Sequence, residues 1–137
     1  MKNEISNILN LIENGDTFKA LERAKLFYKK DQNNLDAIKL LAYSYIQLGN
    51  FEQVIEVLEQ GYNKRKDQRD FDYFNNMGYS LSQIEEYEDS ISHLKRAQEL
   101  KNGPSVKTCL AEVYLKQRNF TQAGEMILSA LDDIKKI

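Results

Sequence analysis

Two side chains in this sequence are the first candidates for catalysis or metal binding: its single histidine, His93, and its single cysteine, Cys109. A metal site or a catalytic base needs several converging partners, and no second His or Cys can supply them. Cys109 has only Lys107 as a basic neighbour in the sequence, so little would activate its thiol. No glycine-rich phosphate-binding loop appears. The sequence therefore favours a protein that is not an enzyme and that uses no cofactor or metal.

The composition describes one folded domain with nearly balanced charge. The chain has 137 residues, 42% of them hydrophobic, with 19 basic and 21 acidic side chains. This balance creates no net field to attract nucleic acid or an anionic membrane, and no apolar run is long enough to span a bilayer. The start of the chain does not resemble a secretory signal, and an unpaired Cys suits a reducing compartment. We expect a cytoplasmic protein with no nucleic-acid and no membrane partner.

A short pattern of small and aromatic residues returns four times along the chain. Its copies are Gly15-Asp16 with Ala20, Gly49-Asn50-Phe51 with Val54, Glu85-Glu86-Tyr87 with Ser90, and Arg118-Asn119-Phe120 with Ala123. The copies are 34, 36 and 33 residues apart, and a second row at the same intervals contains Leu11, Tyr45, Leu81 and Tyr114. A period of this length is typical of stacked helical repeats, which usually form binding surfaces.

Between these markers the apolar residues follow helical spacing, as Ile38, Leu41, Ala42 and Tyr45 do. Seven breaks divide the chain into eight helices, at residues 14–16, 32–34, 49–50, 66–68, 85–86, 102–104 and 118–119. Short connections pair consecutive helices as antiparallel hairpins. The expected fold is therefore all-α: an α-solenoid of four helical hairpins stacked in a right-handed superhelix. Tyr45 and Tyr114 are expected to be buried inside their hairpins.

The chain resembles a tetratricopeptide repeat array over residues 2–137. The second repeat carries the residue types of that family at Ile38, Leu41, Ala42, Tyr45, Gly49, Phe51, Val54, Leu58 and Gly61. The first repeat departs most, with Ile8 where the family has a small residue. The resemblance implies a single domain of four repeats, at about 2–34, 35–68, 71–103 and 104–137.

The resemblance also implies that the first helix of each hairpin lines an inner, concave groove. Repeat spacing then predicts the residues that line it: Ile5, Leu9, Ile12, Lys39, Tyr43, Ile46, Asn75, Asn76, Tyr79 and Glu112. Tyr43 and Tyr79 occupy equivalent sites in adjacent repeats and are expected to lie side by side. Tyrosine is enriched at binding hot spots because it offers a large contact area and a hydroxyl group. Asn76 stands where the family often uses Asn to bond a ligand's backbone.

Three functions fit such an array. The leading hypothesis is a non-catalytic adaptor that binds a peptide or protein segment in the groove. The alternatives are an assembly module that self-associates and a bacterial chaperone that escorts secreted proteins. Binding of a heat-shock chaperone's terminal carboxylate is disfavoured, since only Lys39 and Asn76 of the family's five-residue set are present.

The last expected helix, from about Phe120 to Ile137, has too many apolar residues for one buried stripe. Ala123, Ile127 and Ala130 can pack on the preceding helix. That leaves Leu128, Leu131 and Ile134 at least partly uncovered. These three residues predict a contact with a second copy, as a homodimer, or with a partner protein.

Overall fold

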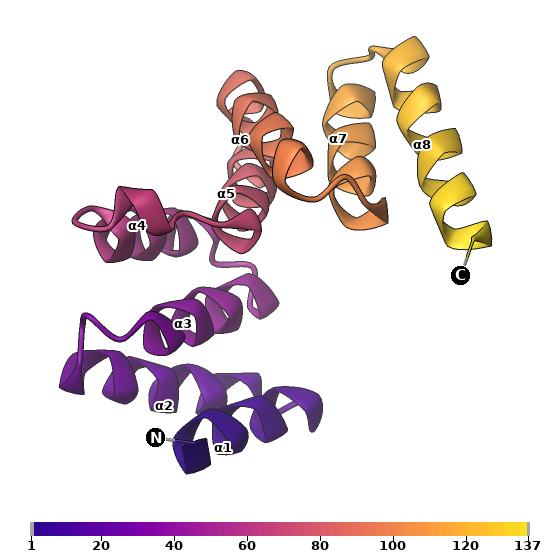
Figure 1. The fold of residues 1–137 in the computed structure, drawn as a ribbon. Helices are drawn as coiled ribbons and strands as arrows, with labels where there is room; N and C mark the ends of the chain where they lie inside the picture. The colour runs from indigo at the N-terminus through magenta and orange to yellow at the C-terminus, as the bar shows by residue number, and fades with distance from the viewer. Residues whose placement is uncertain (1, 137) are drawn as a thin grey trace. The chain divides into compact units, whose positions relative to one another are not determined.

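The computed structural model describes residues 2–136, and its regular structure over that range is helical (Figure 1). The helices are α1 (Lys2–Glu13), α2 (Thr17–Lys30), α3 (Leu35–Gln47), α4 (Phe51–Tyr62), α5 (Phe71–Gln83), α6 (Tyr87–Leu100), α7 (Pro104–Lys116) and α8 (Phe120–Lys135), with a short 3-10 helix, η1 (Lys66–Gln68), after α4. Within residues 2–136 no strand is found. The predicted all-α fold is confirmed, and so are the seven predicted breaks. Ile137, the expected end of the last helix, lies outside the described residues.

The helices form two compact units, Met1–Asp67 and Gln68–Ile137. In the first unit, α1 packs against α2 and α3, and α3 packs against α2 and α4. In the second unit, α5 packs against α6 and α7, and α7 packs against α6 and α8. The chain is thus an α-solenoid whose helix pairs match the four expected repeats. The single domain over residues 2–137 and the handedness of the superhelix stay predictions.

The turn inside each hairpin has the same geometry in all four repeats. One residue adopts a left-handed conformation: Gly15 (φ 85°), Gly49 (φ 75°), Glu85 (φ 68°) and Arg118 (φ 64°). The next backbone N–H donates to a carbonyl five residues earlier, in the pairs Asp16 to Leu11 (2.8 Å), Asn50 to Tyr45 (2.9 Å), Glu86 to Leu81 (2.9 Å) and Asn119 to Tyr114 (2.8 Å). This is the hydrogen bond of the Schellman motif, which ends a helix. The small and aromatic pattern of the sequence therefore contains the donors of this hydrogen bond. The second repeating row, Leu11, Tyr45, Leu81 and Tyr114, contains its acceptors.

Local capping explains where two of the other helices begin. The side chain of Asp70 accepts a hydrogen bond from the Tyr73 backbone N–H at 3.0 Å at the start of α5. Pro104 occupies the first turn of α7, where a missing N–H costs nothing. Both features were expected from the sequence and are confirmed.

The core of the second unit lies between α6, α7 and α8. Its buried members are Leu94, Ala97, Val106, Leu110, Val113, Tyr114 and Ala123. Leu94 is fully buried and fits against α5 only because residue 78 is a glycine, since a Cβ there would lie 2.5 Å from the Leu94 Cγ atom. Close packing of α5 on α6 thus depends on this one small residue.

The prediction that both tyrosines of the repeat row are buried is right for Tyr114 and wrong for Tyr45. Tyr114 is 6% exposed, whereas Tyr45 is half-buried and lines an open cavity of about 240 Å³. The Nζ atom of Lys25, on α2, lies 5.8 Å from the centre of the Tyr45 ring. A cation covers this ring in place of an apolar neighbour, and water therefore reaches it.

Candidate functional site

In the second unit α5 and α7 share a polar face, here called the α5/α7 face, which holds Asn75, Tyr79, Ser105, Cys109 and Glu112 and is predicted to include Asn76. Asn75 Nδ2 donates to Ser105 Oγ at 3.5 Å. The pKa of Tyr79 is raised by burial and, to a lesser degree, by Glu112 and Cys109. These interactions join residues of α5 to residues of α7. Of the predicted groove residues of this unit, the structure brings Tyr79 near Glu112 and links Asn75 to α7 through Ser105, while the place of Asn76 in the face stays a prediction.

The chemistry of this face is hydrogen bonding. Burial and the neighbouring Glu112 raise the pKa of the Cys109 thiol from 9 to about 11. The thiol is therefore protonated at neutral pH, when a cysteine nucleophile would need to be a thiolate. The Tyr79 hydroxyl also keeps its proton and can donate. Such a face can orient a polar ligand, but its cysteine is not activated for attack.

His93 lies on α6 and is not part of this face. Its Nδ1 atom is 2.8 Å from the Asp89 backbone oxygen, and its ring is about 6 Å from the rings of Tyr73 and Phe74. Residues 2–136 contain no group of three or more His, Cys, Asp or Glu side chains that could hold a metal ion. His93 is thus a packed helix residue, as expected.

In the first unit α1 and α3 are in contact, and the predicted groove residues on them are here called the α1/α3 face: Ile5, Leu9, Ile12, Lys39, Tyr43 and Ile46. Leu9 is 39% exposed and Tyr43 is 41% exposed, while the other four are half-buried. Leu9 occupies the repeat position of Tyr79, and Tyr43 that of Glu112. Since α1 packs on α3 as α5 packs on α7, the repeat geometry predicts that Leu9 lies beside Tyr43. Two adjacent helices thus expose an aliphatic and an aromatic side chain on one face.

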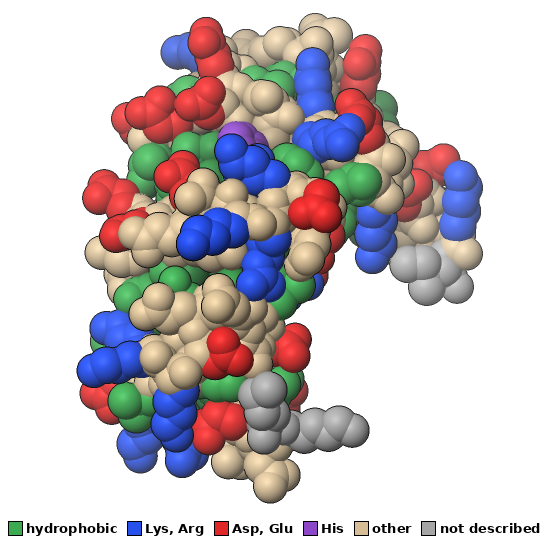
Figure 2. Space-filling view, turned by 60° about the vertical axis from the view of Figure 1, so that its left-hand side comes forward, with side chains coloured by type: hydrophobic (Ala, Val, Ile, Leu, Met, Phe, Trp, Pro, Cys, Tyr) green, Lys and Arg blue, Asp and Glu red, His purple; other side chains and the backbone are tan. Residues whose placement is uncertain are grey.

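The predicted groove residues therefore divide between two faces, one in each unit. Tyr43 belongs to the first unit and Tyr79 to the second, so their predicted side-by-side placement stays a prediction. Acidic and basic side chains are interspersed on the side of the molecule drawn in Figure 2.

The outer side of α8 is exposed, as predicted for Leu128 (70%), Leu131 (49%) and Ile134 (54%). The prediction that Ile127 packs on the preceding helix is wrong, because Ile127 is 42% exposed. Only the small residues Ala123 and Ala130 are buried on α8. Phe120, 61% exposed, also belongs to this side and was not predicted, although it lies seven residues before Ile127.

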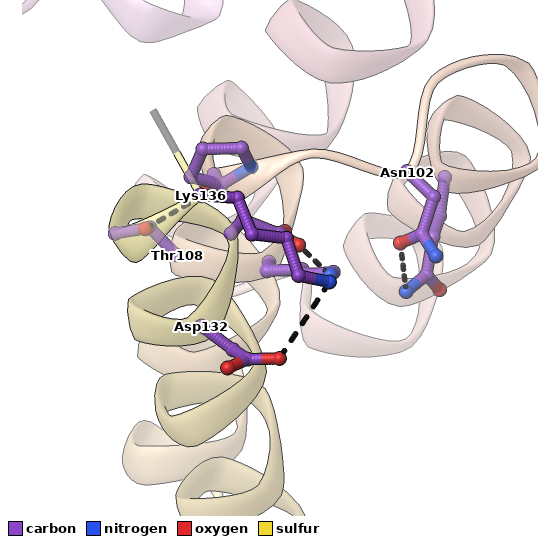
Figure 3. Close-up of polar contacts among 8 residues, drawn as sticks. Asn102, Thr108, Asp132 and Lys136 are labelled. Atoms are coloured by element: carbon purple, nitrogen blue, oxygen red, sulfur yellow. Dashed lines mark hydrogen bonds and ion pairs between the residues drawn. The ribbon is translucent and has the colours of Figure 1, made fainter.

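Polar contacts hold α8 against α7 at its C-terminal end. Lys107 Nζ donates to Asp133 Oδ2 at 2.5 Å, and Lys107 is buried. Directly after α8, Lys136 Nζ lies 3.7 Å from Asp132 Oδ2 of that helix, and on α7 the Thr108 hydroxyl donates to the Pro104 carbonyl (Figure 3). The buried Lys107–Asp133 pair was not anticipated from the sequence.

Two segments of the chain match a model of a known protein family. Residues 36–63 and 71–104 match the model described as tetratricopeptide repeat. Both segments are therefore identified as tetratricopeptide repeats. The matched segments are its second and third repeats, which hold α3, α4, α5 and α6.

Solved structures extend the repeat fold to the first and last hairpins. The thermophilic tetratricopeptide repeat protein TTC0263 of Thermus thermophilus is 21% identical, with a TM-score of 0.83 over 97% of this chain and 73% of its own. MamA from Desulfovibrio magneticus RS-1, from residue 41 to its end, is 15% identical, with a TM-score of 0.84 over 98% of this chain and 76% of its own. At these identities the likeness is one of fold. A comparison with curated protein sequences finds no significant match.

Tetratricopeptide repeats generally mediate protein–protein interaction, so the repeat fold supports a protein-binding role. Among residues 2–136, no helix is long and apolar enough to cross a bilayer.

Proposed function

We propose that this tetratricopeptide repeat protein is a non-catalytic adaptor that binds a segment of another protein on its inner faces. The observation that carries the proposal is the exposure of Leu9 and Tyr43. They lie on α1 and α3, the first helices of the two hairpins in the first unit. A folded protein gains by burying such neighbouring apolar side chains, and an aromatic ring beside an aliphatic one is a common anchor site.

The two faces suit different parts of a bound segment. The α1/α3 face offers the aliphatic side chains of Ile5, Leu9 and Ile12 beside the Tyr43 ring, which suits an apolar anchor. The α5/α7 face offers amide, hydroxyl and carboxylate groups, which suit a polar or basic portion. Asn75 Oδ1 is buried without a hydrogen-bond partner among the described residues. An unpaired buried acceptor carries an energetic cost, which the Asn75 side chain would relieve by turning outward to a backbone N–H of a bound segment.

Replacing both Tyr43 and Tyr79 by Ala should weaken partner binding by about 2 kcal/mol or more, roughly 30-fold, if both tyrosines are hot spots. Tyr43 is exposed and Tyr79 is half-buried, so the double variant should keep its helical circular dichroism spectrum. The measurement is capture of protein partners on immobilised wild type and variant, followed by titration of the purified partner.

The matched control is Phe18→Ala, which removes an aromatic ring that is 75% exposed on α2, a helix that contributes no residue to either face. This variant should capture the same partner at wild-type strength. Equal capture by the double tyrosine variant and by the wild type would contradict the groove assignment. Loss of capture by Phe18→Ala alone would move the binding surface to α2.

A further inference from the structure

Asparagine followed by glycine is the dipeptide in which a side chain and the backbone react most readily with each other. The glycine nitrogen attacks the Cγ atom of the asparagine, and the absence of a Cβ atom leaves this approach open. The sequence contains two such pairs, Asn14-Gly15 and Asn102-Gly103. Both asparagines are exposed, so the backbone around each pair decides whether it reacts.

The fold holds the first pair in a conformation unsuited to this reaction. The Asn14 N–H donates to the Asn10 carbonyl at 3.0 Å. The Gly15 N–H donates to the Ile12 carbonyl at 3.1 Å, and the Schellman hydrogen bond of the Asp16 N–H follows directly. These hydrogen bonds fix the backbone dihedrals of the pair. The Gly15 nitrogen can rotate toward the Asn14 Cγ atom only if they break.

The second pair lies in the link between α6 and α7, outside both helices. Lys101 (φ −155°, ψ 100°) and Gly103 (φ −122°, ψ −176°) have extended backbones. Pro104 disfavours the helical region for the residue before it, so this link does not continue a helix. The Gly103 N–H donates to the Lys101 carbonyl, two residues back, at 3.1 Å. Only this local contact has to give way when the Gly103 nitrogen turns toward the Asn102 Cγ atom.

A hydrogen bond also prepares the Asn102 side chain. Gln98 Nε2, in the last turn of α6, donates to Asn102 Oδ1 at 3.0 Å (Figure 3). Attack at Cγ places negative charge on this oxygen, and a donor already directed at it stabilises that charge. Gln98 is thus a positioning residue that favours the reaction at Asn102.

We propose that Asn102 is a modification site, at which the chain deamidates without an enzyme. The Gly103 nitrogen loses its proton and bonds to Asn102 Cγ. The bond from Cγ to Nδ2 breaks, and Nδ2 takes a proton and leaves as ammonia, so that a cyclic succinimide remains. Water then adds to either succinimide carbonyl and opens the ring to aspartate or to isoaspartate. The reaction does not depend on the binding proposed for the inner faces.

The two products affect α7 in opposite directions. Aspartate places a carboxylate directly before the N-cap residue Gly103, and a negative charge there stabilises a helix whose first turn holds no acidic residue. Isoaspartate adds one carbon atom to the backbone between Lys101 and Gly103. The start of α7 then shifts relative to α6, and it carries the buried Val106 and Lys107 with it. The isoaspartate form should therefore be the less stable one.

Peptide mapping by mass spectrometry tests the site. The full chain is incubated at mildly alkaline pH and digested in heavy-oxygen water, which labels any conversion that occurs during digestion. The acid form should accumulate at residue 102 while Asn14 stays an amide. In urea both sites should convert at comparable rates, because the hydrogen bonds that protect Asn14 are gone. Equal rates at the two sites in the folded chain, or no conversion at residue 102, would overturn the proposal.

Gly103→Ala is the matched variant. No atom lies within 4 Å of the place of an added Cβ, and a φ of −122° suits any residue, so this variant should fold as the wild type does. It should lose most of the conversion, since the new methyl group hinders the attack. Gln98→Ala should slow the conversion roughly two- to tenfold, the contribution of one hydrogen bond. Wild-type rates in Gly103→Ala would overturn the ring closure, and wild-type rates in Gln98→Ala would overturn the role of Gln98.

Urea unfolding tests the effect on α7. Asn102→Asp reproduces the aspartate product and should unfold at the same or a higher urea concentration than the wild type. The isoaspartate form, separated from the aged protein by ion exchange, should unfold at a lower one. The reverse order would contradict the effects assigned to the two products.

Discussion

Replacing Asp133 by Ala should destabilise the protein by about 3 kcal/mol, since it would strand a buried lysine. The Lys107 side chain is 7% exposed and that of Asp133 is 24% exposed, with 2.5 Å between Nζ and Oδ2. Removing one partner of a buried pair costs about 3–5 kcal/mol, because the other charge stays desolvated. The partial exposure of Asp133 puts the expected loss at the lower end. Urea unfolding followed by circular dichroism measures it.

The matched control removes both charges. Lys107 has the repeat position of Phe74, and Asp133 has that of Leu100, so the neighbouring hairpin already fills both places with apolar side chains. Lys107→Met with Asp133→Leu should therefore be as stable as the wild type to within about 1 kcal/mol, or more stable. If the double variant loses as much stability as Asp133→Ala alone, the fit of the side chains, and not an unpaired charge, determines the stability of this contact.

Leu94→Ala should cost about 3 kcal/mol, within the range of 2–5 kcal/mol for a fully buried leucine. Leu94 is 0% exposed and sits between Gly78 and the core residues of α7. Removing it leaves a cavity that neither α5 nor α7 can close without moving. The midpoint of urea unfolding reports the loss.

Ile127→Ala is the matched control, because Ile127 has the same repeat position and is 42% exposed. It should cost less than about 1 kcal/mol at a concentration low enough to keep the chain monomeric. Equal losses for the two variants would mean that Ile127 is covered in the monomer. The outer side of α8 would then not be open.

The repeat spacing predicted the helices well because one local hydrogen bond sets it. Each hairpin turn needs a residue that tolerates positive φ. The backbone N–H of the residue after it needs a carbonyl acceptor five residues earlier. Both groups lie within a short stretch of chain. Glycine is the residue favoured at this turn, and it is present as Gly15 and Gly49. Glu85 and Arg118 adopt the same conformation in the other two repeats. Local geometry of this kind is written in consecutive residues.

Burial was harder to predict, because it depends on which neighbour covers a side chain. Tyr45 and Tyr114 share one row, yet Lys25 lies over Tyr45 while Tyr114 sits in an apolar core. Repeat spacing identifies equivalent positions but not the residue that faces each of them. For the same reason, the prediction that Ile127 packs on the preceding helix is wrong, although Ile127 shares the repeat position of the buried Leu94.

The Lys107–Asp133 pair shows the same limit for polar residues. The two are 26 residues apart, and charged residues in a helix are usually on the surface. The available signal was a lysine at a position that holds Ile38 and Phe74 in the two middle repeats. A charge at a core position of a repeat indicates a buried partner on the paired helix.

For the candidate groove, repeat spacing gave a list of positions that stays a prediction. It did not include Ser105 and Cys109, which contact or lie near Asn75 and Tyr79 in the structure. The coupling of Tyr79 with Glu112 and Cys109 depends on how α5 and α7 approach each other. The spacing of residues along the sequence does not show how closely these two helices approach.

Site-specific photo-crosslinking tests the central claim, binding of a protein segment on the inner faces, most directly. Benzoylphenylalanine replaces Tyr43, Tyr79 or, as the control, Phe18 on α2, and each protein is irradiated in an extract of its own source cells. We expect positions 43 and 79 to trap the same partner protein, excess unlabelled wild type to suppress this adduct, and position 18 to trap none of it. An adduct at position 18 equal to that at 43, or no specific adduct at either 43 or 79, would contradict the account.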